Sequence, residues 1–459
     1  MLRSDTPIRL QSLVPVIERM FELSGQKIAG IQKSWDSAKG SPVFTVEGKY
    51  TSRGWTEWTQ GFQFGSAVIQ YEVTGEKEFL TIGRDGTLRE MPRHISHVGV
   101  HDHGFNTIST CGNLLRLMRE KKIPYDEWEK NFYELAIKIS GAVQAARWTD
   151  IGENQGYIYS FNGPHSLFAD TIRSLRVLAV AHQLGHVLMG EKDRRINLLE
   201  RLLQHAETTA RFNVYFGEGR DSFDVRGRVA HESIFNTNDG SYRCASTQQG
   251  YSPFTTWTRG LAWIMLGYAE ELEFLLTLPA DELAAFGGRK KILLAFENIA
   301  RATSHFYLNN TPTDGVPYWD TGAPGLSKLG TYFERPADPF NEYEPVDSSA
   351  AAIAAQAFVR LGNTLISLGE KGSGEKYLQA GLALASRVFQ EPYLSVDPNH
   401  EGLILHSVYH RPNGWDHIPA GKKIPCGEST MWGDYHAREL GLLILRMAKN
   451  EPYFTFFLK

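Results

Sequence analysis

Helical segments with an apolar face recur along almost the whole chain. Apolar residues return at a spacing near 3.6 in ten segments, at residues 10–23, 64–73, 110–119, 128–146, 167–184, 194–211, 258–275, 290–306, 349–368 and 374–389. Several segments end alike, with a glycine after the helix and charged residues in the first turn of the next, as at Gly75, Gly185 and Gly369. This repetition predicts stacked helical hairpins.

Two long segments, 213–256 and 308–347, interrupt the helical pattern. They are rich in Gly, Pro, Asn, Asp and aromatic residues and show little periodicity. Loops of this length are functional or disordered, and the aromatic content argues against disorder. We therefore expect an all-α toroid whose mouth, at the rim formed by these loops, holds the site. No linker separates two apolar halves, so we expect one domain over 1–459, with 1–40 a helical N-terminal segment packed on it.

The composition excludes several classes of protein. The chain has 459 residues and a formal net charge of −4, which gives no electrostatic reason to expect nucleic acid or an anionic membrane surface. No apolar run reaches the roughly 20 residues that span a bilayer. Three scattered cysteines predict neither a disulfide framework nor a zinc site. We expect a monomer or weak homo-oligomer in the cytoplasm, or in the periplasm if a signal peptide has been removed.

Two acids occur in unusual contexts. Asp170 lies in the apolar segment 167–184, where a charged carboxylate is costly unless it is paired or used in chemistry. The alternative is a buried acid satisfied by Arg173 or a loop amide. Asp102 lies in a His-Asp-His-Gly-Phe motif at 101–105, either as a second acid of the site or as a helix N-cap. Two such acids among many aromatic residues indicate carbohydrate chemistry.

Tryptophans cluster with polar residues at 55–62 and 257–263. The flat face of an indole suits the apolar face of a sugar ring, although these side chains could equally fill the core of a toroid. Arg259 lies between Trp257 and Trp263 in the sequence. Its guanidinium, between two indoles, is suited to bind a sugar carboxylate bidentately.

Histidines near the acids raise the question of a metal. His101 and His103 lie two residues apart, without a histidine at i+4 and without an accompanying Cys or Glu ligand pattern, and His165 and His231 add none. We therefore expect no metal and no other cofactor. The chain also has no glycine-rich phosphate loop and no serine nucleophile elbow.

A series of short motifs is spread over most of the chain in one order. It runs through Trp58-Thr59-Gln60-Gly61-Phe62, His101-Asp102-His103-Gly104-Phe105, Asp170, His231, Gln249-Gly250-Tyr251, Trp257-Thr258-Arg259-Gly260-Leu261-Ala262-Trp263, Asp347-Ser348-Ser349 and Met431-Trp432-Gly433-Asp434-Tyr435. In this order the motifs resemble glycoside hydrolase family 88, the unsaturated glucuronyl hydrolases.

The resemblance implies an (α/α)6 barrel and a metal-free hydrolase. Such enzymes remove the Δ4,5-unsaturated uronic acid that polysaccharide lyases leave at the non-reducing end of an oligosaccharide. The acid matching Asp170 protonates C4 of the enol ether and activates a water that adds at C5. A group that acts first as acid and then as base requires a pKa held up by an apolar site. The acid matching Asp102 supports catalysis.

The resemblance also implies a set of substrate contacts. The expected substrate-binding residues are Trp58, His101, His231, Gln248, Trp257, Arg259 and Trp263. Relatives usually have His where this chain has Gln248, and a neutral amide cannot take a positive charge. Phe161 stands where relatives often have Trp, so the aromatic face remains and the indole N–H is lost.

Three other functions stay open at this point. An unsaturated rhamnogalacturonyl hydrolase would use the same toroid, although the paired Asp102 and Asp170 lean away from it. A sugar epimerase, like the N-acylglucosamine 2-epimerases, would need His101, His231 and His406 to converge as bases. A sugar-binding relative without activity would have Asp170 locked in an ion pair with Arg173.

Overall fold

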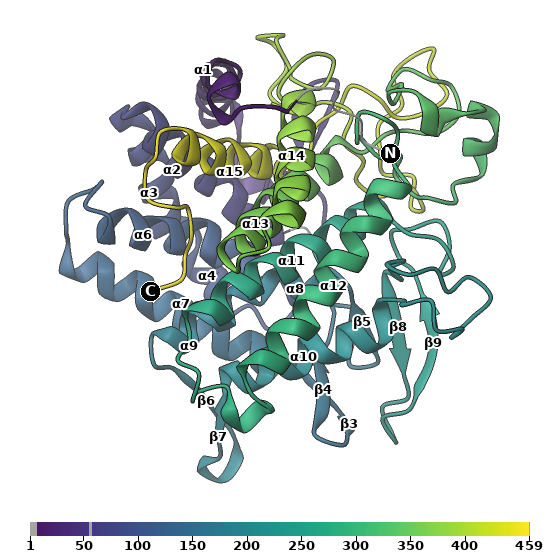
Figure 1. Ribbon diagram of the computed structural model, residues 1–459. Helices are drawn as coiled ribbons and strands as arrows, with labels where there is room; N and C mark the ends of the chain where they lie inside the picture. Colours follow the sequence, from purple (N-terminus) through teal and green to yellow (C-terminus); the bar gives the residue numbers. More distant parts are fainter. Residues whose placement is uncertain (1–6, 55–56, 459) are drawn as a thin grey trace.

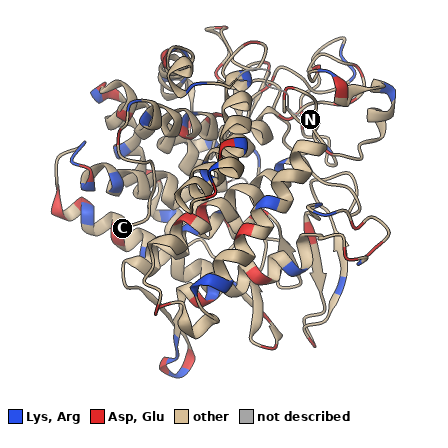
Figure 2. Cartoon of the chain, viewed as in Figure 1, with Lys and Arg blue, Asp and Glu red and all other residues tan. Residues whose placement is uncertain are grey.

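The computed structural model describes residues 7–54 and 57–458 (Figure 1). Residues 1–6 of the predicted N-terminal segment therefore lie outside the described residues, as do Trp55 and Thr56 of the first tryptophan cluster. Figure 2 shows Lys and Arg interspersed with Asp and Glu along the helices of this view. In the described part of the chain, no helix combines the length and the hydropathy that crossing a bilayer requires.

The helices form two concentric layers. Among the described residues, the inner layer has six segments: α2 (Gln60–Thr74); the run of α5 (His103–Thr107), the π-helical η3 (Ile108–Gly112) and α6 (Asn113–Arg119); the pair α8 (Thr171–Ser174) and α9 (Arg176–Gln183); α11 (Thr258–Thr277); α13 (Ser348–Ser367); and α15 (Met431–Ala448). Each segment packs against the next, and α15 packs against α2. The inner layer is therefore a closed ring.

The outer layer alternates with the inner one along the chain. Its helices are α1 (Leu10–Ser34), α3 (Lys77–Glu90), α7 (Glu127–Ala146), α10 (Leu198–Asn213), α12 (Arg289–Asn309) and α14 (Lys371–Val388), with the short α4 (Pro92–Ile95) after α3. α3, α12 and α14 pack on α2, α11 and α13, α7 and α10 pack on α9, and α1 packs on α15 and α2. This arrangement is an (α/α)6 barrel, so the predicted fold is confirmed.

Local sequence explains where these helices start and how closely they pack. Asp126 caps α7, because its carboxylate accepts the backbone N–H of Glu129 at 2.9 Å. Gly75 ends α2 with φ at 74°, a backbone conformation that costs glycine little. Between α13 and α14, a Cβ on Gly362 would lie 2.7 Å from the backbone nitrogen of Leu378. The two helices can approach this closely because glycine stands there.

Small antiparallel sheets lie in the loops. Among the described residues they are β1 (Phe44–Val46) with β2 (Lys49–Thr51), β3 (Trp148–Gly152) with β4 (Gln155–Ile158), β6 (Val187–Met189) with β7 (Arg195–Asn197), and the three-stranded sheet β5 (Ser166–Phe168), β8 (Glu232–Phe235), β9 (Tyr242–Ser246). The segment 213–256 is thus partly a β-hairpin, and 308–347 contains the 3-10 turns Pro324–Leu329 and Tyr332–Glu334.

The prediction of one helix over 167–184 is wrong. Leu167 and Phe168 belong to β5, where they pair with Ser233 and Glu232 of β8. The helix begins only at Thr171, so the acid that precedes it lies at a strand-to-helix junction. Residues 166–181 are buried throughout, and a fully buried segment has no polar face from which a period could separate strand from helix.

Candidate active site

A pocket opens where the inner helices begin. It is lined by Gly54, Trp58, His101, Asp102, Phe105, Phe161, Asp170, Gln248, Gln249, Trp257, Arg259, Trp263, Tyr409, His410, Asn413 and Trp415. Asp102, Asp170 and Trp257 directly precede α5, α8 and α11. Ring closure thus brings residues more than 300 positions apart to one rim. Of the two long loops expected there, 213–256 supplies Gln248 and Gln249, whereas no described residue of 308–347 lines the pocket.

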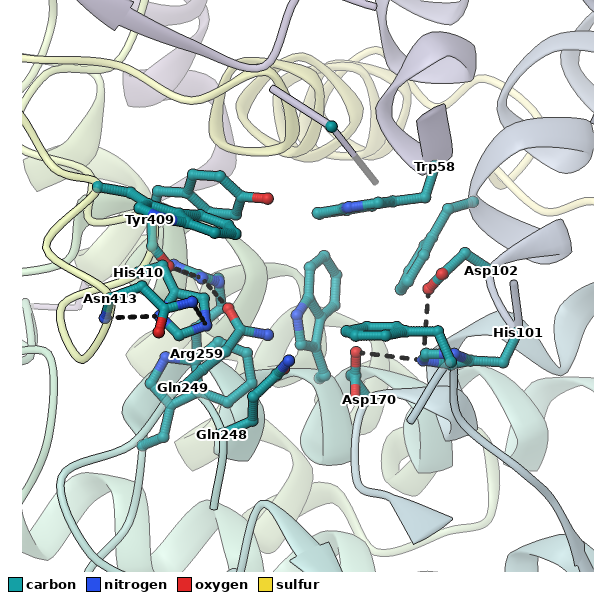
Figure 3. A pocket seen from close by; sticks show the side chains of 16 residues that line it. Trp58, His101, Asp102, Asp170, Gln248, Gln249, Arg259, Tyr409, His410 and Asn413 are labelled. Atoms are coloured by element: carbon teal, nitrogen blue, oxygen red, sulfur yellow. Dashed lines mark hydrogen bonds and ion pairs between the residues drawn. The ribbon is translucent and has the colours of Figure 1, made fainter. Parts of the chain in front are cut away.

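One side of the pocket is formed by Asp102, His101 and Asp170. His231 is not among the lining residues but lies against Asp170, and these four residues are here called the acid wall. Nε2 of His101 lies 3.6 Å from Oδ1 of Asp102 and 3.7 Å from Oδ2 of Asp170 (Figure 3). Nε2 of His231 lies 3.9 Å from Oδ1 of Asp170. All four residues are buried. Two carboxylates therefore share one imidazole, and the second imidazole faces the free oxygen of Asp170.

The structure does not support an N-cap role for Asp102 or an ion pair between Asp170 and Arg173. Asp102 occupies the N-cap position of α5, but its side chain accepts no capping hydrogen bond. Arg173 is turned away from Asp170 and forms ion pairs with Glu270 at 2.6 Å and Glu439 at 3.1 Å. The ion pair with Arg173 that an inactive sugar-binding relative would require is therefore not formed.

Burial and mutual charge set the protonation of the acid wall. Burial, together with the charge of Asp170, raises the pKa of Asp102 to about 6 against the pull of His101. Burial lowers the pKa of His101, but the charges of Asp102 and Asp170 outweigh it, so the net shift is upward. Burial raises the pKa of Asp170, but His101 and His231 outweigh it and the net shift is downward.

This pattern corrects one expectation. The sequence predicts that the pKa of Asp170 is held up by an apolar helix, whereas the raised carboxyl pKa belongs to Asp102. The reason is the neighbouring imidazole of His101, which carries a proton between the two acids. A proton near Asp170 is therefore held more readily by His101 than by Asp170 itself.

The same residues could supply ligands to a cation. One atom each of His101, Asp102 and Asp170 lie within 4.8 Å of one another, and all three residues are buried. A protonated imidazole between two carboxylates balances this charge without an ion. That the site works without a metal stays a prediction.

The opposite side of the pocket is formed by Gln248, Gln249, Arg259, His410 and Asn413, here called the amide wall (Figure 3). The guanidinium of Arg259 donates to Asp347 at 3.0 Å, to Gln249 Oε1 at 3.0 Å, and to the backbone carbonyls of Val408 and Tyr409. Both terminal nitrogens are thus engaged. A sugar carboxylate could take them only by replacing one of these bonds.

The rings around Arg259 differ from those expected. Its guanidinium lies over Trp257 and Trp432, at 4.6 and 4.8 Å from the ring centroids, rather than between Trp257 and Trp263. Because Oε1 of Gln249 accepts from Arg259, the amide NH₂ of Gln249 is the end that remains to donate. Arg259 therefore orients the amide wall.

His410 is neutral near pH 7. Burial and the nearby charge of Arg259 lower its pKa to about 4. The backbone N–H of Asn413 donates to its Nδ1 at 3.3 Å. Of the five residues of the amide wall, only Arg259 therefore carries a charge at neutral pH.

Aromatic side chains complete the pocket. Trp58 stacks on Trp432 with centroids 5.1 Å apart and 25° between the planes. Phe161 is 40% exposed and stacks on His101 at 5.8 Å and 23°. Trp257 and Trp263 are almost fully buried, at 3% and 2% exposure, so little of either ring is open to the pocket. A flat ring bound here would meet Trp58 and Phe161 first.

The chain has relatives of known activity. No family model matches it. It is 25% identical over 386 residues to an unsaturated glucuronyl hydrolase of Formosa agariphila, covering 83% of this chain and 78% of the relative. It is 26% identical over 408 residues to one of a Bacillus species, covering 87% and 89%. An unsaturated chondroitin disaccharide hydrolase of Streptococcus pyogenes is 24% identical over 416 residues, covering 89% and 86%.

Solved structures of unsaturated glucuronyl hydrolases have a similar fold. The unsaturated glucuronyl hydrolase of Bacillus sp. GL1 superposes with a TM-score of 0.69 at 21% identity, covering 96% of this chain and 99% of that one. One specific for heparin superposes with a TM-score of 0.70 at 19% identity, covering 95% and 98%. The predicted resemblance to the unsaturated glucuronyl hydrolases is confirmed. At these identities the solved structures establish the shared fold.

The arrangement expected of an epimerase is not formed. His101 and His231 meet at Asp170, but His406 is not among the described residues that line the pocket. Its Nδ1 accepts the backbone N–H of Gly427 at 3.1 Å, and its ring packs against Phe340.

Sequence reasoning missed one part of the site. Tyr409, His410, Asn413 and Trp415 line the pocket from a single loop. Tyr409, His410 and Trp415 are aromatic neighbours of one another, with centroids of His410 and Trp415 4.9 Å apart. The cluster of aromatic and polar residues at 409–415 is the signal that could have revealed it.

Proposed function

We propose that this chain hydrolyses oligosaccharides that end in a Δ4,5-unsaturated uronic acid, by hydrating the C4–C5 double bond. The observation that carries the proposal is the acid wall, where Asp170 and Asp102 share His101 in a buried, aromatic-lined pocket. The relatives named as unsaturated glucuronyl and unsaturated chondroitin disaccharide hydrolases support this substrate class and make the chain a glycoside hydrolase.

The acid wall suits the chemistry of a polarised double bond. Asp170 donates a proton to C4 while a water oxygen forms the new bond to C5, and the proton of that water passes back to Asp170. The product is a hemiketal, which opens to a keto acid and releases the remaining sugar. Asp102 and His101 hold the proton that Asp170 needs when substrate binds.

The remaining walls orient the ring. Trp58 offers an indole face, and Gln248 and Gln249 offer amide donors to hydroxyl or carboxylate oxygens. Because this reaction hydrates a double bond, the carboxylate spacing that separates retaining from inverting glycosidases does not apply to Asp102 and Asp170. Binding and chemistry are thus divided between the amide wall and the acid wall.

The test is ultraviolet absorbance of the conjugated enol-carboxylate. The purified protein is mixed with a panel of lyase-generated unsaturated disaccharides, and the loss of absorbance is followed. We expect loss with the wild type and with Asp314→Asn, whose buried carboxylate lies outside the pocket and accepts backbone N–H groups of Val316 and Ala337. Asp170→Asn should show none. Unchanged absorbance with every disaccharide would refute the activity.

A further inference from the structure

His231 has a fixed tautomer. Its Nδ1 accepts the backbone N–H of Gln248 at 3.0 Å and that of Gln249 at 3.3 Å. A ring nitrogen that accepts a hydrogen bond carries no proton, so the neutral imidazole must carry its proton on Nε2. The loop that bears two residues of the amide wall therefore decides which nitrogen of His231 donates.

The ring is also fixed in orientation. His231 is 2% exposed, and its ring contacts Phe168 at 4.4 Å and Trp257 at 4.8 Å between centroids. Its backbone carbonyl accepts the N–H of Ala169, the residue before Asp170, at 2.8 Å. The imidazole and the carboxylate are thus held in one frame by the pairing of β5 with β8.

Two polar atoms in this frame face each other. Nε2 of His231 and Oδ1 of Asp170 are 3.9 Å apart, and within the described residues neither has a hydrogen-bond partner. This distance is too long for a direct hydrogen bond. Two hydrogen bonds of about 2.8 Å to one water oxygen span this distance when the angle between them is about 90°. Nε2–H can only donate, and the Asp170 carboxylate can accept.

We propose that His231 is a positioning residue that holds the water which adds to C5, with Nε2–H donating to the water oxygen while the water donates to Asp170 Oδ1. This inference rests on the proposed function. The water oxygen bonds to C5, its proton passes to Asp170, and C4 takes the proton that Asp170 gives up. His231 keeps its own proton throughout the step.

Charge supports this assignment. Burial lowers the pKa of His231, so the ring stays neutral near pH 7 despite the charge of Asp170. Nε2 of His101 faces the other oxygen of Asp170, at 3.7 Å from Oδ2, and likewise makes no direct hydrogen bond within the described residues. The two oxygens of one carboxylate thus have different neighbours, a proton holder on one side and a water holder on the other.

Two substitutions separate the two nitrogens. His231→Asn places an amide near the position of Nδ1, where it can accept from Gln248 and Gln249, but leaves no donor at Nε2. His231→Gln reaches the Nε2 position with a donor and removes the acceptor. We expect kcat to fall about 100-fold in His231→Asn with KM within threefold, since a positioned donor is lost. In His231→Gln, kcat should fall only about tenfold and KM should rise, since the loop is released.

The matched control is His205→Asn. His205 is fully buried and accepts the backbone N–H of Ile158 on Nδ1 at 3.0 Å, as His231 accepts from its loop, but its Nε2 lies 3.3 Å from Thr209 Oγ1 instead of facing Asp170. Its kcat should stay within twofold of wild type. A kcat within threefold of wild type in His231→Asn would overturn the inference while leaving the proposed function intact.

A second readout does not depend on activity. Nitrogen-15 NMR of the histidine-labelled full chain, assigned with His231→Gln, should show the Nε2–H tautomer at pH 7. An Nδ1–H tautomer or an imidazolium would overturn the positioning role. A wild type that hydrates no unsaturated disaccharide would refute the proposed function itself, whatever the tautomer.

Discussion

Asp170 and Arg173 are three residues apart but belong to two different buried charge clusters. Asp170 joins the acid wall, where its neighbours are His101 and His231. Arg173 joins a cluster on the inner ring, where Arg173, Arg176 and Arg360 meet Glu270 and Glu439. Both clusters are withdrawn from solvent, so burial does not distinguish them. The two clusters differ in the basic residues beside their carboxylates, which are histidines in the acid wall and arginines in the inner ring.

Arginine and histidine give buried carboxylates different properties. Burial alone would raise the pKa of Glu439, but Arg176 and Arg173 outweigh it and hold that pKa far below its usual range. Arginine does not lose its proton in proteins, so Glu439 stays an anion. Histidine titrates near neutral pH, so protons in the acid wall can move between Asp102, His101 and Asp170. We therefore expect the arginine cluster to serve stability and the acid wall to serve proton transfer.

The largest expected effect is the loss of activity in Asp170→Asn. The amide keeps the shape of the side chain but can neither give a proton to C4 nor take one from water, so kcat should fall about 1000-fold or more. The rate is measured by absorbance on the best unsaturated disaccharide. The melting temperature should stay within a few degrees of wild type, and a rate within tenfold of wild type would contradict the role.

Glu439→Gln tests whether the arginine cluster of the inner ring stabilises the fold. It would leave Arg173 paired with Glu270 alone and Arg176 without an ion pair among the described residues, so the free energy of unfolding should fall by about 3 kcal/mol. Urea denaturation measures this change. If Asp170→Asn destabilised the fold as much as Glu439→Gln, the division between the two clusters would be wrong.

The pH dependence of activity sharpens the contrast. The groups that face Asp102 are His101, Asp170 and Arg147, and the pKa of Asp102 is raised to about 6. Above that pH the acid wall holds one proton fewer, so kcat/KM should fall about tenfold per pH unit. Initial rates between pH 5 and 8 check this. If kcat/KM did not begin to fall near pH 6, protonation of Asp102 would not be required for activity.

The smallest effect is on stability. The folded-state pKa of Asp102, about 6, lies above its ordinary value of 3.8, so between these values the folded state binds more protons than the unfolded state. The free energy of unfolding therefore falls as pH rises through this window. At pH 7.5 Asp102→Asn should be more stable than wild type, by at most the roughly 3 kcal/mol that the difference between the two pKa values gives, and near pH 4 the two should be nearly equal. Urea denaturation of both proteins at pH 4 and pH 7.5 measures this difference. Equal stability at pH 7.5 would show that the charge of Asp102 does not destabilise the folded state.

Much of the ring was predictable from the chain. The segment 258–275 has a sharp start and became α11 (Thr258–Thr277), and 128–146 became α7 with nearly the same bounds. α15 was not predicted as a helix. It is buried on nearly all sides, and its Arg438, Glu439 and Arg446 face other buried groups, so it lacks a solvent face and hence a clear period.

The site was predictable where residue type alone implies chemistry. Asp102 and Asp170 stand out because acids in apolar contexts need a reason, and the structure brings them together. The hydrogen bonds of Arg259 could not be predicted, because its partners Asp347 and Val408 lie 88 and 149 residues away in the sequence. The proton balance could not be predicted either, since it depends on distances of less than 4 Å between groups on different elements.

Closure of the ring by α15 against α2 has a consequence for synthesis. The pocket takes Trp58 from one end of the chain and Trp415 from the other, and Trp58 rests on Trp432. While the ribosome is still making the first four hundred residues, those that follow are not yet available to complete the rim. The nascent polypeptide must therefore keep its early helices folded or protected before an active rim exists, and no N-terminal fragment can act as a smaller enzyme.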